Sequence, residues 1–166
     1  MLKKLLIAVA IMLPTIVSAQ TVKLGLVNTQ SILTSMPESK EAEEKLAAIS
    51  KKYEDEYAKL GEEMKRKLDE FQALKEDEPQ AIKDRKMQDL QEYQGKIQQF
   101  EQMAQQDIQK QQEALMTPII SKVRGAIESV GKEGNYTTIQ EIGAVLYFGS
   151  PAEDITPQVK AKLGLK

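Results

Sequence analysis

The chain has 166 residues, of which 29% are charged and 5% aromatic, and it contains neither cysteine nor histidine. Without these two residue types, disulfides and the usual zinc, copper and haem sites cannot form. The formal net charge of −2 argues against a general nucleic-acid-binding or anionic-lipid-binding protein. Because Gly-rich phosphate loops and the Gly-x-Ser-x-Gly elbow are also missing, we expect neither an enzyme nor a cofactor.

The first 19 residues have the features of a secretory signal peptide. Lys3 and Lys4 precede an apolar run, and Val17 and Ala19 occupy the small-residue positions that a signal peptidase recognises. A retained membrane anchor is the alternative, but Pro14 interrupts the run, which is shorter than the roughly 20 residues that a bilayer span needs. We therefore expect cleavage after Ala19 and export. Losing two lysines leaves 21 basic and 25 acidic residues, a formal charge of −4.

A short strand and a short helix are predicted at the start of the mature chain. Apolar residues alternate at every second position from Val22 to Leu26, which is typical of a strand with one buried face. Either Asn28 or Thr29 can then serve as the N-cap of a short helix that ends near Ser35.

Two long stretches of the middle region share one spacing of apolar or small residues. The spacing of 4, 3, 4, 4, 3, 4 places them along one stripe of a long helix. Paired from opposite ends, the residue numbers always sum to 157, as an antiparallel hairpin of two helices requires. We therefore predict that the two stripes form the seam of such a hairpin. The stripe positions are Ala42, Leu46, Ile49, Tyr53, Tyr57, Leu60 and Met64, and then Tyr93, Ile97, Phe100, Ala104, Ile108, Gln111 and Leu115.

The turn of this hairpin is predicted near residue 78. Pro79 suits the first turn of a new helix, whereas Glu78 before it is disfavoured in a helix. The hairpin then spans residues 38–117, and each arm reaches about 55 to 60 Å at 1.5 Å per residue. Glutamine, which is abundant in the second arm, forms helix well and adds neither charge nor a large apolar patch. The composition therefore favours a protruding, nearly straight prong.

After the hairpin, the sequence predicts more helix, two strands and a final helix. The second arm continues past Pro118 with a denser apolar face until Gly134 offers a C-cap. Two short strands around a turn at Gly143 follow, and then a helix capped by Thr156 with Pro157 at its first position. Three strands are too few to close a sheet or to bury both of its faces, so we expect several copies of the chain to assemble.

The predicted fold class is therefore α+β and mostly α. A small β-rich body, through which several copies assemble, would comprise residues 20–37 and 118–166, and the long antiparallel helical hairpin would comprise residues 38–117.

Three residues of the hairpin are candidate hinges. Pro118 removes a backbone hydrogen bond and should bend the second helix at the root of the hairpin. Gly61 and Gly95 lie almost level in the two arms and should weaken both of them at mid-length. The alternative for the glycines is that each is merely tolerated on an exposed helix face.

Several segments together resemble one known family. They are KLGLVNTQSIL with Asn28 and Gln30, the charged and Gln-rich hairpin, YTTIQEIGAVLYFGS with Tyr147, and DITPQVKAKL with Asp154, Ile155, Thr156, Val159 and Leu163. In this combination the mature chain resembles the Skp/OmpH family of periplasmic chaperones over nearly its whole length. The resemblance implies a homotrimer whose three helical hairpins enclose a central cavity. It further implies ATP-independent holding of unfolded outer-membrane proteins, which prevents their aggregation in the periplasm.

One departure from that family concerns charge, because its well-known members tend to be strongly basic. The acidic balance puts capture of acidic clients, and contact with lipopolysaccharide or membranes, in doubt. Met103 and Met116 are candidate client-contacting residues, since Met side chains adapt to varied partners; alternatively, they cover the edge of the seam. The competing function is a structural coiled-coil spacer or adaptor of the cell envelope, which would bind one folded partner rather than several unfolded ones.

Overall fold

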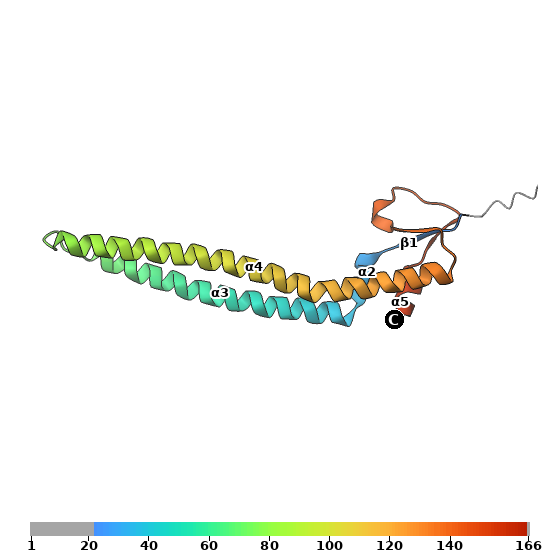
Figure 1. Ribbon diagram of the computed structural model, residues 1–166, viewed down its shortest axis with the longest axis horizontal. Coiled ribbons are helices and arrows are strands. Elements are labelled where there is room, and N and C mark those ends of the chain that lie inside the picture. Colours follow the sequence, from blue (N-terminus) through green and yellow to red (C-terminus); the bar gives the residue numbers. More distant parts are fainter. Residues whose placement is uncertain (1–21, 166) are drawn as a thin grey trace, which may run out of the picture.

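The computed structural model describes residues 22–165 and shows a long helical hairpin that projects from a small body (Figure 1). The predicted signal peptide lies outside the described residues. The mostly α class, with long helices and a small sheet, is confirmed. In chain order the elements are β1 (Leu24–Val27), α2 (Thr29–Ser35), α3 (Pro37–Gln72), α4 (Gln80–Glu133), β2 (Thr138–Glu141), the 3-10 helix η1 (Ile142–Ala144), β3 (Ala152–Asp154) and α5 (Thr156–Lys162).

The hairpin consists of α3 and the first part of α4, which lie side by side and run in opposite directions (Figure 1). The chain reverses between Gln72 and Gln80. Pro79 does not occupy the first helical position: its ψ of 136° keeps it extended, so it precedes α4 as the N-cap residue. Helix α4 continues without interruption from the hairpin into the body, with Pro118 inside it.

The sheet of the body has three strands in the order β2-β1-β3, and both neighbours run parallel to β1. The predicted turn between two strands at Gly143 is wrong: residues 142–144 form η1, and the third strand begins only at Ala152. A tight turn joins antiparallel strands, whereas two strands parallel to β1 on its opposite edges require the chain to cross between those edges. Residues 145–151 make that crossing.

Strand β1 is covered on both faces, not on one as its alternation predicted. Gly25 and Val27 are buried together with Leu26. A Cβ on Gly25 would lie 3.0 Å from Ile139 Cγ1 and 3.2 Å from a Tyr136 ring carbon. A larger residue would therefore force β2, and Tyr136 just before it, to shift. Glycine therefore allows the close contact at the centre of the sheet.

The core of the body joins α2, α4 and α5. Its largest fully buried side chains are Ile32, Met36, Ile155 and Val159. From α4, Val123 and its neighbours one turn away pack into the same cluster. Full burial of each such aliphatic side chain stabilises the fold by roughly 1.5 to 3 kcal/mol. The core therefore holds the root of the hairpin to both ends of the chain.

Two polar contacts fix where the short helices begin. The N-cap of α2 is Asn28, whose side-chain oxygen accepts a hydrogen bond from the Ser31 N–H at 2.8 Å. Thr156 is not the cap of α5, as predicted, but its first residue. The buried Thr156 hydroxyl accepts from the Asn28 N–H at 2.9 Å and donates to Asp154 Oδ1 at 2.6 Å. It thereby ties the end of β1 to the start of α5.

The end of α4 also differs in detail from the prediction. Gly134 follows the helix but keeps a right-handed conformation, with φ of −87°. The left-handed position is the next residue, Asn135, with φ of 52°. Asparagine is among the few non-glycine residues that adopt this conformation at low cost.

Candidate functional site

Burial along the two arms follows the predicted stripe. Ala42 and Ala104 are buried, and Tyr57 is the one stripe residue that is exposed, at 46%. Leu90, which was not among the predicted stripe positions, is buried and lies three residues before Tyr93 on the same face of α4. The remaining stripe residues are half-buried: Leu46, Ile49, Tyr53, Leu60, Met64, Tyr93, Ile97, Phe100, Ile108, Gln111 and Leu115.

At mid-length, the two arms contact each other through an aromatic pair. The Tyr53 and Phe100 rings lie 5.9 Å apart between centroids, at an interplanar angle of 60°. The Tyr53 hydroxyl donates to Asp107 Oδ2 across the hairpin at 2.8 Å. This hydrogen bond to a carboxylate is the main reason that the pKa of Tyr53 lies above its ordinary value.

An apolar groove of about 410 Å³ lies beside this pair; we call it the mid-arm groove. Two carboxylates and no basic side chain occur among its lining residues in the described part of the chain. One of the carboxylates, Glu101, interacts with the Tyr57 hydroxyl and raises the pKa of that tyrosine. The groove is lined by Tyr53, Glu54, Tyr57, Phe100, Glu101, Ala104, Gln105 and Ile108.

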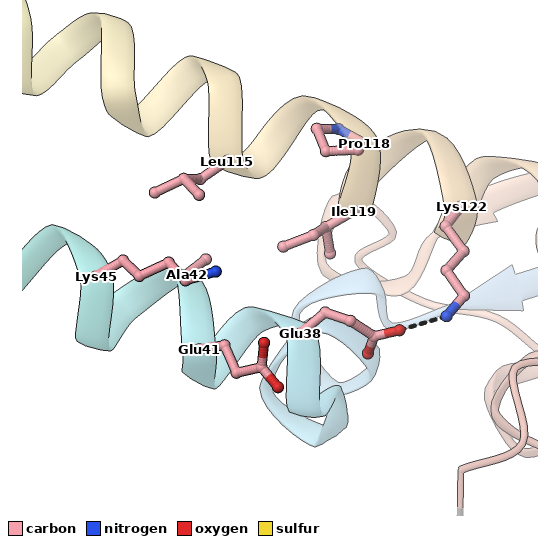
Figure 2. Close-up of a pocket in the computed structure, with 8 residues that line it drawn as sticks. All are labelled: Glu38, Glu41, Ala42, Lys45, Leu115, Pro118, Ile119 and Lys122. Carbon is pink, nitrogen blue, oxygen red and sulfur yellow. Dashed lines mark hydrogen bonds and ion pairs between the residues drawn. The ribbon is translucent and has the colours of Figure 1, made fainter.

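The root of the hairpin contains a smaller hollow of about 250 Å³ (Figure 2). Figure 2 shows Lys122 of α4 reaching the carboxylate of Glu38 on α3. Hydrogen bonding to Lys122 is the largest cause that lowers the pKa of Glu38. Pro118 is among the residues that line this hollow (Figure 2). Ser39, nearby on α3, is buried, and its hydroxyl has no hydrogen-bond partner among the described residues.

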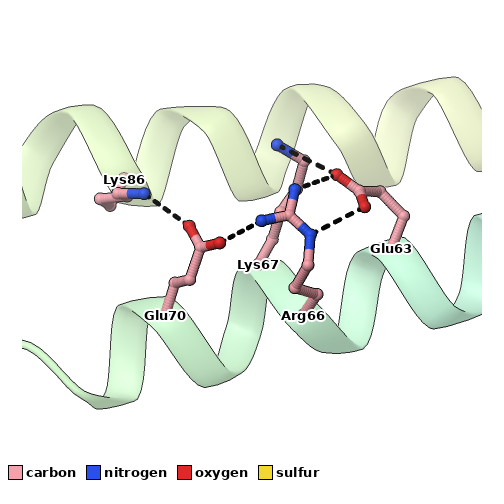
Figure 3. Close-up of polar contacts among 5 residues, drawn as sticks. All are labelled: Glu63, Arg66, Lys67, Glu70 and Lys86. Atoms are coloured by element: carbon pink, nitrogen blue, oxygen red, sulfur yellow. Dashed lines mark hydrogen bonds and ion pairs between the residues drawn. The ribbon is translucent and has the colours of Figure 1, made fainter.

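The far end of the hairpin carries a network of ion pairs (Figure 3). Arg66 lies between Glu63 and Glu70 on α3, and Lys86 reaches Glu70 from α4 at 2.7 Å. The hydrogen bond from Arg66 lowers the pKa of Glu63, and that from Lys86 lowers the pKa of Glu70. Lys67 adds a weaker contact to Glu63 at 3.9 Å. The network links the two arms close to the turn.

Acid is expected to loosen this end of the hairpin. The pKa values of Glu63 and Glu70 lie below the ordinary 4.5, so their stabilising contribution is present above that pH and is lost as the pH falls through the lowered values. Thermal unfolding, followed by circular dichroism at about pH 6 and about pH 3, should show a larger drop in Tm for the wild type than for Glu63→Gln/Glu70→Gln. Equal drops would mean that the network contributes nothing. The effect should be modest, because the side chains are partly exposed to solvent.

The body leaves an apolar segment uncovered between η1 and β3. Leu146 and Tyr147 are 106% and 87% exposed, and Phe148 is 44% exposed. Beside this segment, a hollow of about 340 Å³ reaches β1 at Leu24 and Leu26. Within the described chain, these side chains therefore have little contact with the core.

The structure separates the two candidate methionines. Met103 is 54% exposed and lies one turn of α4 beyond Phe100. Met116 is half-buried and packs against the core cluster. Gly61 and Gly95 both lie on exposed helix faces, where an added Cβ would meet no heavy atom within 4 Å.

Two features are absent from residues 22–165. No helix in that range has the length and apolar character needed to cross a bilayer. The same range holds no group of three or more acidic, histidine or cysteine side chains that could bind a metal ion.

The comparison with protein families decides the family of the chain. The family model described as "Outer membrane protein (OmpH-like)" matches residues 23–163, which include the whole hairpin and nearly all of the described body. The chain belongs to the OmpH-like family.

The OmpH-like fold is also found in a solved structure. A crystal structure from Caulobacter crescentus CB15, described as a candidate outer membrane chaperone (OmpH-like), is similar with a TM-score of 0.71 and 16% sequence identity. The similarity covers 86% of this chain and 83% of the other. No curated protein matches the sequence.

Proposed function

We propose that this OmpH-like protein is an ATP-independent holdase chaperone of the periplasm, which binds unfolded outer-membrane proteins and prevents their aggregation. Family membership and the similarity to the Caulobacter structure support a chaperone-type role. The observation that carries the proposal is the hairpin itself. Arms of 36 residues in α3 and a longer stretch of α4 project from the body with mostly polar, exposed surfaces. Such a surface offers many weak contacts, and multivalency can then hold a client without a single tight site.

The proposed assembly is a homotrimer whose hairpins surround a cavity. Its support is the uncovered segment at residues 146–148 together with the two open edges of a three-stranded sheet. Exposed apolar patches and unpaired strand edges are the features that association between copies covers. The proposed function requires neither nucleic acid nor a cofactor.

Light scattering tests the holdase. A denatured outer-membrane barrel protein is diluted into buffer with and without this chain, and a second, unrelated aggregation-prone protein is treated in the same way. The holdase proposal expects suppressed scattering for both. A structural spacer or adaptor would leave the scattering unchanged and would instead bind one folded envelope protein stoichiometrically. A mass measurement of the oligomer, made on the same sample, tests the trimer separately.

Exchanging Gly61 and Gly95 for alanine is expected to stabilise the hairpin. Both glycines lie inside helices, and a Cβ fits at each without contact. Because a helix-interior glycine is about 1 kcal/mol less favourable than alanine, the double variant should gain up to about 2 kcal/mol. Thermal unfolding measures the gain, and Gly125→Ala, which has the same free space but lies in α4 beyond the hairpin, should gain up to about 1 kcal/mol for the same reason.

The same variant tests whether the arms flex at mid-length. If flexing widens the cavity for larger clients, the double alanine variant should protect large unfolded proteins less well than small ones, and Gly125→Ala should not. Equal protection of both sizes would leave the two glycines as residues tolerated on exposed faces.

A further inference from the structure

The mid-arm groove is unlike the rest of the hairpin surface. Most outward positions of α3 and α4 are charged or amide side chains, yet at this height the aromatic faces of Tyr57 and Phe100 border an open groove. Tyr57 is 46% exposed although it belongs to the seam stripe. Solvent-exposed apolar hollows on soluble proteins commonly mark interaction sites. The volume of about 410 Å³ is in the range of pockets that hold small ligands or a few side chains.

The carboxylates around the groove determine which kind of peptide segment could bind there. Glu54 and Glu101 line it, one from each arm, and Asp107 lies beside it in its hydrogen bond with Tyr53. No lysine or arginine lines the groove in the described part of the chain. An acidic segment would therefore meet repulsion there, whereas a cation beside an inserted apolar side chain would meet carboxylates and the faces of electron-rich rings.

We propose that the mid-arm groove binds segments of unfolded polypeptide in which an aromatic or aliphatic side chain is flanked by lysine or arginine. The apolar side chain enters between Tyr57, Phe100 and Ile108, and the flanking cations contact Glu54 and Glu101. This inference rests on the proposed holdase function and names the part of the client that the hairpin captures. One such groove occurs on each hairpin, so several copies of the chain would hold several segments of one client weakly and at once.

Peptide binding to the unaltered mature protein is the first test. Three fluorescein-labelled peptides of equal length are compared by fluorescence anisotropy: a phenylalanine between lysines, a phenylalanine between glutamates, and a serine between lysines. The lysine-flanked phenylalanine should bind most tightly, by roughly 3- to 10-fold over the glutamate-flanked peptide at low salt, because exposed ion pairs contribute little each. This preference should shrink as salt is added. Equal affinities for the two phenylalanine peptides would overturn the proposal.

Two variants then locate the binding. Glu54→Gln/Glu101→Gln should remove the preference for lysine flanks while keeping the phenylalanine contact, and Tyr57→Ser should weaken both phenylalanine peptides. The matched control is Glu62→Gln/Glu113→Gln, which removes two exposed carboxylates elsewhere on the arms and should leave the preference intact. An equal loss of preference in the control would show that net charge, and not the groove, selects the peptide.

Three further outcomes separate the groove assignment from the holdase function. If neighbouring copies of the chain fill the groove, no peptide binds and Tyr57→Ser changes the mass of the oligomer; this result would overturn the inference. If the peptides bind as expected but the wild type fails to suppress aggregation in light scattering, the groove assignment stands and the holdase function does not. The reverse result, full suppression of aggregation without peptide preference, would remove the groove assignment alone.

Discussion

Replacing Leu146 and Tyr147 with serine is expected to convert the proposed trimer into monomers. Both side chains are almost fully exposed in the single chain, and burying each against another copy would stabilise the assembly by roughly 1.5 to 3 kcal/mol. In a trimer, the serine variant would lose this stabilisation at every copy. Analytical ultracentrifugation measures the mass, and far-ultraviolet circular dichroism should show unchanged helix content, since neither side chain belongs to the core. The control is Ile82→Ser, a change of a 42% exposed residue on the far part of the hairpin.

A companion deletion asks whether assembly depends on the body alone. A chain in which a short turn replaces residues 40–115 should keep the same number of copies, because the uncovered segment and the strand edges remain. A well-folded monomer from this deletion would contradict the model in which the body assembles the protein.

Replacing Ile155 with alanine is expected to cost about 2 to 5 kcal/mol of folding stability, the range for large-to-small changes in a packed core. Ile155 is 0% exposed and precedes α5, and its backbone N–H donates to the Leu26 carbonyl at 2.8 Å. The backbone bond survives the change, so the loss reports on packing. Urea unfolding measures it. Ile120→Ala, at a 46% exposed position of α4, should change the stability by no more than about 0.5 kcal/mol. A similar cost at both positions would mean that Ile155 contributes no more packing energy than an exposed residue.

The arms were predictable because the pattern of apolar residues that defines them is local in the sequence and repeated. The spacing of the stripe recurs every eleven residues, and every stripe residue except Tyr57 is at least half-buried. At Tyr53, the contacts across the hairpin are to Phe100 and Asp107, which lie on either side of the predicted partner Ala104. The groove was not predictable from that spacing. By spacing, Tyr57 belongs to the seam, yet its side chain is 46% exposed, and the spacing of residues does not record how closely two helices pack.

The order and direction of the strands in the sheet could not be predicted from the sequence. The sequence around Gly143 has the local features of a strand turn, but the pairing that decides the topology involves residues more than a hundred positions away, such as Leu24 with Thr138. The role of Thr156 was missed for the same reason. Its hydroxyl satisfies a backbone donor at Asn28, at the other end of the chain, and no local pattern indicates that partner.

The position of β1 in the middle of the sheet has a consequence for the order of folding. Both of its partner strands come from the last thirty or so residues of the chain, so the sheet cannot begin to form until those residues have been synthesised. Closing so long a loop is entropically costly and slow, whereas the contacts of each arm with itself are local and fast. The hairpin makes up most of that loop and folds back on itself at one short turn. When it forms, it brings the start of α3 and the body part of α4 together before the sheet pairs. The arms that project from the finished protein thus also serve as the guide that brings its two ends into register.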